Sequence, residues 1–298
     1  MPTPSVLPLP DHAGPGVAAV ATGVAWVDRS HWTQLELTGD DRLNFLHSQT
    51  TNDFKRLQTG QGCETVFVTA TARTIDLATA YINDDSVLIL ASPGLADRLL
   101  AWLDRYIFPA DQVAVRDRSA EFACFTVLGP ESAAWLDRVG LLSLAIGQVL
   151  PLHHHQTVVW QGTPVQIAAG SSLAVPGFTL WLAAGEPAAA LVAAFNDAGL
   201  PALSETDWEI LRIQQGRPKP GQELTDEFNA VEAALWRGIS LNKGCYIGQE
   251  TIARLDTYKG VRQQLWGIHL PGCSAAIVPG TPLFLPDSGP GTESTLSL

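Results

Sequence analysis

The sequence has 298 residues, of which 46% are hydrophobic and 16% charged, a composition typical of folded globular proteins and not of disordered chains. Its formal net charge of −12 disfavours bulk binding to nucleic acid or to an anionic membrane surface. The sequence contains no apolar run of about 18 residues and no basic or apolar segment near its start. We therefore expect no membrane span and no targeting signal, and a cytoplasmic protein.

In the first third of the chain, a Pro-rich stretch over residues 1–24 predicts a flexible lead-in. Asp40 and Asp41 follow a strand-like segment and are expected to cap a short helix. Asp84 and Asp85 have the composition of a turn between strands. The expected strands here cover 34–38, 64–70, 74–82 and 86–91, with an amphipathic helix over 95–106.

The middle of the chain repeats this alternation. Strands are expected over 112–116, 121–128, 156–160, 163–169 and 178–184, and helices over 130–139 and 187–198. Strands mostly follow strands, and helices lie between groups of them. This order predicts an α+β fold with antiparallel sheets and excludes a doubly wound parallel sheet.

The last third of the chain differs from the rest in its residue pattern and in its charge. Ser204 begins a helix that includes Trp208 and ends near Gly216, and a second short helix is expected over 249–256. Residues 262–270 have the pattern of a strand that opens a further β unit, and the Gly/Pro/Ser-rich tail offers no obvious closing strand. Residues 205–262 carry eight Lys/Arg against nine Asp/Glu, so this segment is far less acidic than the remainder.

Metal chemistry is weakly supported by the sequence. The four cysteines lack C-x-x-C spacing, which predicts neither a zinc site nor a disulfide framework. The run His153-His154-His155 cannot direct three side chains at one ion from a strand, so we expect a solvated edge or turn there. No metal ligands are assigned.

The octapeptide KGCYIGQE (243–250) holds the strongest candidate for reactivity, Cys245. Lys243 and the start of the following helix would both favour the thiolate. Gly244 and Gly248 allow positive φ or a close approach of the backbone to a ligand. The alternative is a small cysteine buried in a turn.

Aromatic and polar residues near this octapeptide are candidates for ligand contact. Trp32 and Trp208 lie at the edges of expected elements, where an indole can stack on a planar ligand, although most tryptophans belong to cores. Gln249, Glu250 and Arg254 follow the thiol on one helix, where Glu250 and Arg254 also form an i, i+4 pair.

Several segments together resemble the YgfZ-type folate-binding proteins, relatives of the glycine-cleavage T-protein, an aminomethyltransferase. The resemblance covers roughly residues 25–270. It is carried by LTGDDRLNFLHSQTTND (37–53), GQELTDEFN (221–229), EA (232–233), IS (239–240), KGCYIGQE (243–250) and IAR (252–254).

The resemblance implies a T-protein-like fold around a central folate cavity, formed by residues 25–262, with residues 263–298 as a short or incomplete C-terminal β-barrel. It implies tetrahydrofolate as the cofactor, with Trp32 and Trp208 lining its pocket, Gln249, Glu250 and Arg254 as further contacts, and Lys243 and Cys245 as the catalytic residues. The implied role is assistance in assembly or repair of iron–sulfur clusters, including those of tRNA-modifying enzymes. The implied partners are therefore iron–sulfur enzymes or cluster-assembly proteins, with no direct contact to nucleic acid or membrane.

Two alternatives stay open. A folate-dependent aminomethyl or one-carbon transferase needs a carboxylate beside the folate, and Asp76-Leu77 supplies one where the T-protein has two consecutive acids. A non-catalytic scaffold for cluster-assembly proteins would need neither the carboxylate nor the thiol. Thr71-Ala72-Arg73 also departs from the Lys-Gly-Arg or Lys-Gly-Lys turn common in relatives, so no ligand contact is assigned there.

Overall fold

A computed structural model describes residues 14–142, 149–268, 270, 278 and 281. The chain divides into two compact units, Met1–Gly267 and Ile268–Leu298, and the helices and strands described below all belong to the first. Within the described residues, no helix combines the length and apolarity needed to cross a membrane.

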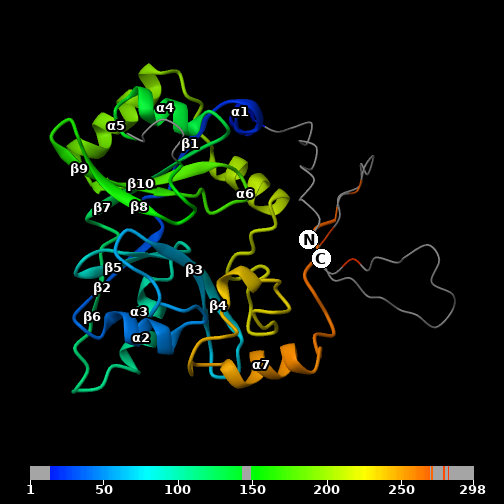
Figure 1. Ribbon diagram of the computed structural model, residues 1–298. Coiled ribbons are helices and arrows are strands. Elements are labelled where there is room, and N and C mark those ends of the chain that lie inside the picture. Colours follow the sequence, from blue (N-terminus) through cyan, green and yellow to red (C-terminus); the bar gives the residue numbers. More distant parts are fainter. Residues whose placement is uncertain (1–13, 143–148, 269, 271–277, 279–280, 282–298) are drawn as a thin grey trace. The chain divides into compact units, whose positions relative to one another are not determined.

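One five-stranded sheet is antiparallel throughout and carries two helices (Figure 1). Its strand order is β1 (Ala25–Asp28), β7 (Phe122–Leu128), β10 (Gly177–Ala183), β9 (Thr163–Ala169) and β8 (His155–Trp160). Helices α4 (Ser132–Arg138) and α5 (Glu186–Asp197) pack against β10. Trp26 of β1 stacks on Phe195 of α5 with ring centroids 4.7 Å apart, which anchors this helix to the sheet.

A second five-stranded antiparallel sheet has its own two helices. The strand order is β3 (Gly62–Val68), β4 (Thr74–Ile82), β5 (Ser86–Ala91), β2 (Thr33–Thr38) and β6 (Ala114–Asp117). Helix α2 (Arg42–Gln49) contacts β5, and α3 (Ala96–Asp104) contacts β2 and β6.

Strand β4 is the centre of the fold, because every one of its residues is buried. A strand buried along both faces must be covered from both sides. Tyr81 of β4 contacts Trp181 of the first sheet with ring centroids 4.7 Å apart, and a shared apolar cluster joins the two sheets. The junction between the sheets is thus packed with aromatic side chains.

Among the described residues of the segment after α6 (Glu205–Gln214), the regular elements are the 3₁₀ turn Trp236–Gly238 and helix α7 (Gln249–Thr257). Its apolar residues Val231 and Ile252 pack against Val66 and Leu77 of β3 and β4. The irregular chain is therefore held by the second sheet, which fixes the octapeptide at its edge.

The predicted α+β class with antiparallel sheets is confirmed, and so is the turn at Asp84 and Asp85 between β4 and β5. The flexible lead-in is wrong over part of its length. Helix α1 (Pro15–Thr22) begins at a proline, and Val17 and Val20 are buried in the cluster between the sheets.

Three further expectations are corrected. The carboxylate of Asp41 accepts from the Gln112 backbone N–H at 2.9 Å and makes no cap bond to α2. His155 is buried in β8, where its ring nitrogens meet Ile82 O and Gln166 Nε2, so it is not on a solvated edge. Residues 262–268 are not a strand, although Leu265 N–H bonds Glu232 O. Most of the expected C-terminal barrel lies outside the described residues.

Candidate functional site

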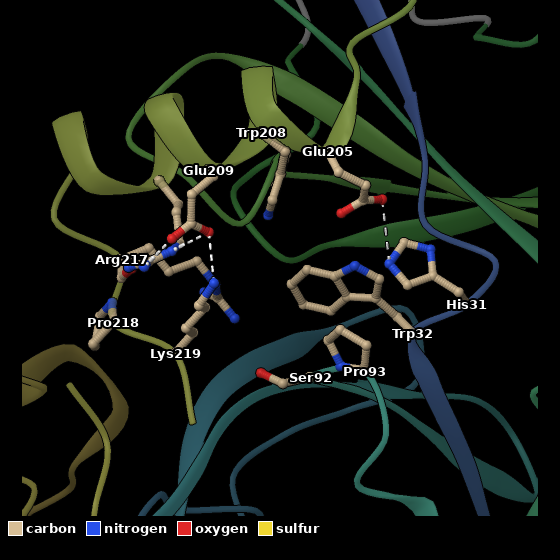
Figure 2. Close-up of a pocket in the computed structure, with 11 residues that line it drawn as sticks. His31, Trp32, Ser92, Pro93, Glu205, Trp208, Glu209, Arg217, Pro218 and Lys219 are labelled. Carbon is tan, nitrogen blue, oxygen red and sulfur yellow. Dashed lines mark hydrogen bonds and ion pairs between the residues drawn. The ribbon is translucent and has the colours of Figure 1, made fainter. Parts of the chain in front are cut away.

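Trp32 and Trp208 come together from distant parts of the sequence. Trp32 lies in the turn before β2, and Trp208 lies on α6, which begins with a capping box between Ser204 and Asp207. The two indoles meet edge to face with centroids 5.8 Å apart. Figure 2 shows them in the wall of a pocket together with Ser92 and Pro93, which follow β5.

Arg29 covers part of this aromatic pair. Its guanidinium carbon lies 3.6 Å from the centroid of Trp32 and 4.9 Å from that of Trp208, a cation–π arrangement. Nη1 donates to Ser172 Oγ at 3.1 Å, whereas Nε and Nη2 are buried without a partner among the described residues. Burial lowers the pKa of Arg29 to about 10, so the group stays cationic at neutral pH.

The basic side chains of the pocket are neutralised by carboxylates. Arg212 pairs with Glu209 and also with Glu223 at 3.0 Å. Lys219 Nζ lies 2.8 Å from Glu209 Oε2. Hydrogen bonds from Arg212 are the main reason that the pKa of Glu209 is lowered. In the pocket, the positive charges of segment 205–262 are therefore offset by carboxylates, so the pocket is not strongly cationic.

Arg217 joins three parts of the chain at the pocket wall. Its guanidinium donates to Leu77 O of β4 at 3.0 Å and to Ser172 O at 3.1 Å, and it lies 3.4 Å from the Glu64 carboxylate of β3. It is 8% exposed, so its first role is to join β4 to the loop between β9 and β10 at the pocket wall.

Asp76 lies behind the pocket wall. Its Oδ1 accepts from Ser92 Oγ at 2.7 Å and its Oδ2 from Ser92 N at 2.8 Å, and the carboxyl is fully buried. Burial raises the pKa of Asp76, although both Ser92 bonds and nearby Arg217 act in the opposite direction. Asp76 is not itself a lining residue, whereas Ser92 is.

Lys243 ties the octapeptide to the end of α2. Its ammonium donates to the carbonyls of His47, Thr50 at 2.7 Å and Asn52 at 2.6 Å, and it lies 4.6 Å from the Tyr246 ring centroid. Three carbonyls use the three N–H groups of an ammonium. The contacts therefore make Lys243 a tether between the octapeptide and the end of α2, and its predicted influence on Cys245 stays a prediction.

The three described cysteines differ in exposure. Cys245 is exposed, Cys63 is half-buried and Cys124 is buried. Burial raises the pKa of Cys63 to about 12, and the charge of Lys243 partly offsets this effect. Burial likewise raises the pKa of Cys124 to about 12. Of these three thiols, the one open to an external reactant is Cys245, so the alternative of a cysteine buried in a turn is not seen.

The polar residues on α7 lie away from the tryptophan pocket. Gln249 Oε1 accepts from the Tyr246 backbone N–H at 3.3 Å, which closes the turn before the helix. Glu250 and Arg254 are exposed. None of these three residues lines the pocket, and neither do Lys243 and Cys245.

The structure thus brings Trp32 and Trp208 together but keeps the octapeptide at a separate edge of the second sheet. Sequence reasoning missed Arg29, Arg217 and Ser92. The only indications of a site role for Arg29 and Arg217 were their positions near Trp32 and shortly after the helix 205–214. Ser92 had no such indication, because its contact with Asp76 depends on how β4 and β5 pair.

Comparison with known proteins now gives the family. The sequence matches the GCVT N-terminal domain over residues 9–243, so the chain belongs to this family, within the glycine-cleavage T-protein superfamily. This match ends at Lys243, two residues before Cys245.

Among its relatives, the chain is 43% identical over 271 residues to the Arabidopsis thaliana protein described as "Putative transferase At1g60990, chloroplastic", covering 91% of this chain and 61% of that protein. It is 27% identical over 257 residues to an aminomethyltransferase of Shouchella clausii, covering 85% and 69%. The chain therefore spans about three fifths of the Arabidopsis relative.

A solved structure shares the fold. The glycine cleavage system aminomethyltransferase T from Bartonella henselae superposes with a TM-score of 0.70 at 18% identity, covering 82% of this chain and 66% of that one. The protein therefore has the T-protein-like α+β fold.

Proposed function

We propose that the protein binds tetrahydrofolate at the tryptophan pocket and acts as a YgfZ-type accessory factor for iron–sulfur proteins, with Cys245 as its reactive thiol. The observation that carries the folate proposal is the meeting of Trp32 and Trp208 in a pocket wall, beside Arg217 and Ser92. Aromatic faces with a few polar groups suit a planar heterocycle that bears hydrogen-bonding edges.

Arg29 adds a reason to expect an acceptor-rich ligand. Its Nε and Nη2 are buried donors without a partner among the described residues, and such groups are costly unless satisfied. A pterin carbonyl or a carboxylate supplies the missing acceptors. Arg29 does not line the pocket, so this contact requires the indole of Trp32 to shift.

The size of the pocket sets a condition on binding. Its cavity volume is about 90 Å³, below the roughly 300 Å³ at the lower end of small-molecule sites. We propose that the walls formed by 92–93 and 217–219 separate to admit the pterin, and that the glutamyl tail lies outside.

Cys245 supplies the proposed link to iron–sulfur clusters, since an exposed thiol can ligate iron or carry sulfur. In a strain lacking the protein, wild type should restore the activity of cluster-containing enzymes and Cys245→Ser should not. The matched control is Cys63→Ser, at a half-buried thiol outside the octapeptide. Full restoration by Cys245→Ser would remove the thiol from the function.

The transferase alternative depends on Asp76. Both of its oxygens are engaged by Ser92 and the carboxyl is fully buried, which favours a structural over a proton-transfer role. Tetrahydrofolate-dependent turnover of an aminomethyl or methylamine substrate, abolished in Asp76→Asn, would instead establish the transferase.

The scaffold alternative requires no chemistry at the octapeptide. It would be favoured if the double variant Lys243→Ala, Cys245→Ala retained full function in the same strain.

The proposed domain organisation follows the resemblance. Residues 25–262 form the folate-binding region, and residues 263–298 form a short or incomplete C-terminal β-barrel.

A further inference from the structure

Strand β6 forms one edge of the second sheet (Figure 1). It pairs with β2 on one side, and among the described residues no strand pairs with its other side. An unpaired edge presents backbone N–H and C=O groups that can bond a further strand. The edge formed by β6 is therefore a place where a strand of another molecule can add to the sheet.

The register with β2 shows which backbone groups of β6 are open. Arg118 N–H donates to Gln34 O at 2.8 Å, so these two residues form a hydrogen-bonded pair. Such pairs alternate with non-hydrogen-bonded pairs along an antiparallel ladder. Arg116, opposite Glu36, is therefore bonded to β2, whereas the N–H and C=O of Val115 point away from β2.

An apolar groove lies beside this edge. It has a volume of about 500 Å³ and is bounded by α3, the chain that follows α3, and β6. Its half-buried apolar side chains, which also pack against the core of the second sheet, are Leu100, Ile107, Val113 and Val115. Phe108, the residue after one of them, is 64% exposed. Apolar side chains gathered at an unpaired strand edge indicate a surface for protein contact.

The charge of this surface differs from that of the whole chain. The segment 96–118, from α3 to the residue after β6, has four arginines and four aspartates, so its formal charge is zero in a chain of −12. Two copies of so acidic a chain repel each other, and they repel least where the facing segments carry no net charge. Arginine is also enriched at protein interfaces. The balance of charge therefore makes a second copy of this chain the partner that fits this surface.

The charged residues of β6 also select a register for pairing with a second copy. A two-fold antiparallel arrangement centred on Val115 places Ala114 opposite Arg116 of the other copy. Centred one residue earlier, it would place Asp111 opposite Asp117, and centred one residue later, Arg116 opposite itself. Like charges directly opposite each other are destabilising. The arrangement centred on Val115 has no such pair.

We propose that the protein forms a two-fold symmetric dimer in which the β6 strands of two copies pair antiparallel around Val115. The two five-stranded sheets then become one sheet of ten strands. The α3 helices of the two copies lie side by side and cover the apolar grooves. The same surface serves both copies, as a closed two-fold dimer requires. The dimer depends on neither folate nor Cys245, so it is independent of the proposed function.

Sedimentation velocity of the full chain tests the dimer. The wild type should pass from monomer to dimer as its concentration rises through the micromolar range. Ala101→Glu adds a carboxylate at an exposed position of the groove, beside Asp104, so like charges of the two copies would meet. Its dissociation constant should be at least about tenfold higher than that of the wild type.

The matched control is Ala189→Glu, at an exposed alanine on α5 of the first sheet, which should dimerise as the wild type does. Circular dichroism checks that both variants are folded. A wild type that stays monomeric at every concentration would overturn the dimer and leave the edge to a strand of a different protein. Equal dissociation constants for wild type and Ala101→Glu would also overturn it.

Disulfide trapping tests the register. Ala114→Cys and Arg116→Cys are made separately in a Cys245→Ser background, which removes the exposed native thiol. Around Val115 these two positions form a non-hydrogen-bonded pair with Cα atoms about 4.5 Å apart, within the range of a disulfide. On mild oxidation, an equal mixture of the two variants should give a covalent dimer, and each variant alone should not. A mixture that stays unlinked, or a link formed by either variant alone, would contradict the proposed pairing.

Discussion

The structure gives the Lys243 ammonium contacts that its position in the sequence did not predict. In the sequence, Lys243 stands two residues before Cys245, where a cation is expected to favour the thiolate. In the structure its ammonium is committed to carbonyls at the end of α2, whose last C=O groups lack partners within the helix. The residue therefore stabilises the position of the octapeptide.

Lys243→Met should lower the free energy of unfolding by about 2–4 kcal/mol, because the substitution leaves buried carbonyls without donors. Urea denaturation of the two proteins measures the difference. Exposed Lys259→Met, which loses only a surface pair with Asp256 at 3.2 Å, is the matched control and should change stability little. An unfolding free energy that is equal in wild type and Lys243→Met would contradict the tether.

The same residue predicts a pH dependence. Burial lowers the pKa of Lys243 from 10.5 to about 7, and Asp53 only partly offsets this effect. Between these values the unfolded chain holds more protons than the folded chain, so the free energy of unfolding rises with pH. Wild type should gain stability relative to Lys243→Met from about pH 7 to about pH 10, and the difference should be constant below pH 7. A difference that stays flat above pH 7 would contradict this assignment.

At the level of elements, periodicity predicted most strands and helices because each presents one regular face to a core. Strands 74–82 and 86–91, for instance, match β4 and β5. It could not predict α1, whose proline-rich sequence becomes helical once Val17 and Val20 have a core to enter. It also could not place Trp32 against Trp208, or His47 against Gly244, because those contacts depend on how the elements pack.

Helix α6 carries Trp208 and begins with a capping box at Ser204, the residue at which the sequence predicted its start. Ser204 Oγ accepts from Asp207 N at 3.1 Å, and Asp207 Oδ2 accepts from Ser204 N at 3.0 Å. Ser204→Ala should cost about 1 kcal/mol of stability, as measured by thermal or urea unfolding. Ser204→Asp, which keeps an acceptor at the cap, should lose less. Equal losses in the two variants would show that the cap is not what stabilises the start of the helix.

Gly248 precedes helix α7 as its N-cap residue, with φ at +82°. A Cβ there would lie 2.9 Å from Thr69 O and 3.1 Å from Ala72 Cα, both backbone atoms. Gly248→Ala should therefore destabilise the protein by about 1–3 kcal/mol through strain and close contact. Gly244→Ala, four residues earlier, meets no such obstacle and should unfold close to the wild type. The reverse order of stability would be inconsistent with this geometry.

At the scale of the whole molecule, two antiparallel sheets meet through aromatic side chains, and the tryptophan pocket opens where α6 and the turn before β2 approach. Arg217 links both sheets at that place. The chain belongs to a family that includes aminomethyltransferases, and its Asp76 carboxylate lies behind Ser92 at the pocket wall. The chain thus keeps the family fold, and the tryptophan pocket at the junction of the sheets is the feature on which the proposed function depends.

Isothermal titration calorimetry with tetrahydrofolate tests that claim most directly. The wild type should show saturable binding at one site, and Trp208→Leu should weaken it about tenfold, in line with the roughly 1–3 kcal/mol of aromatic stacking. Trp160→Leu, at an equally buried tryptophan in the core of the first sheet, controls for loss of an indole and should bind as the wild type does. Absence of saturable binding by the wild type, or equal affinity in Trp208→Leu, would contradict a folate site at this pocket.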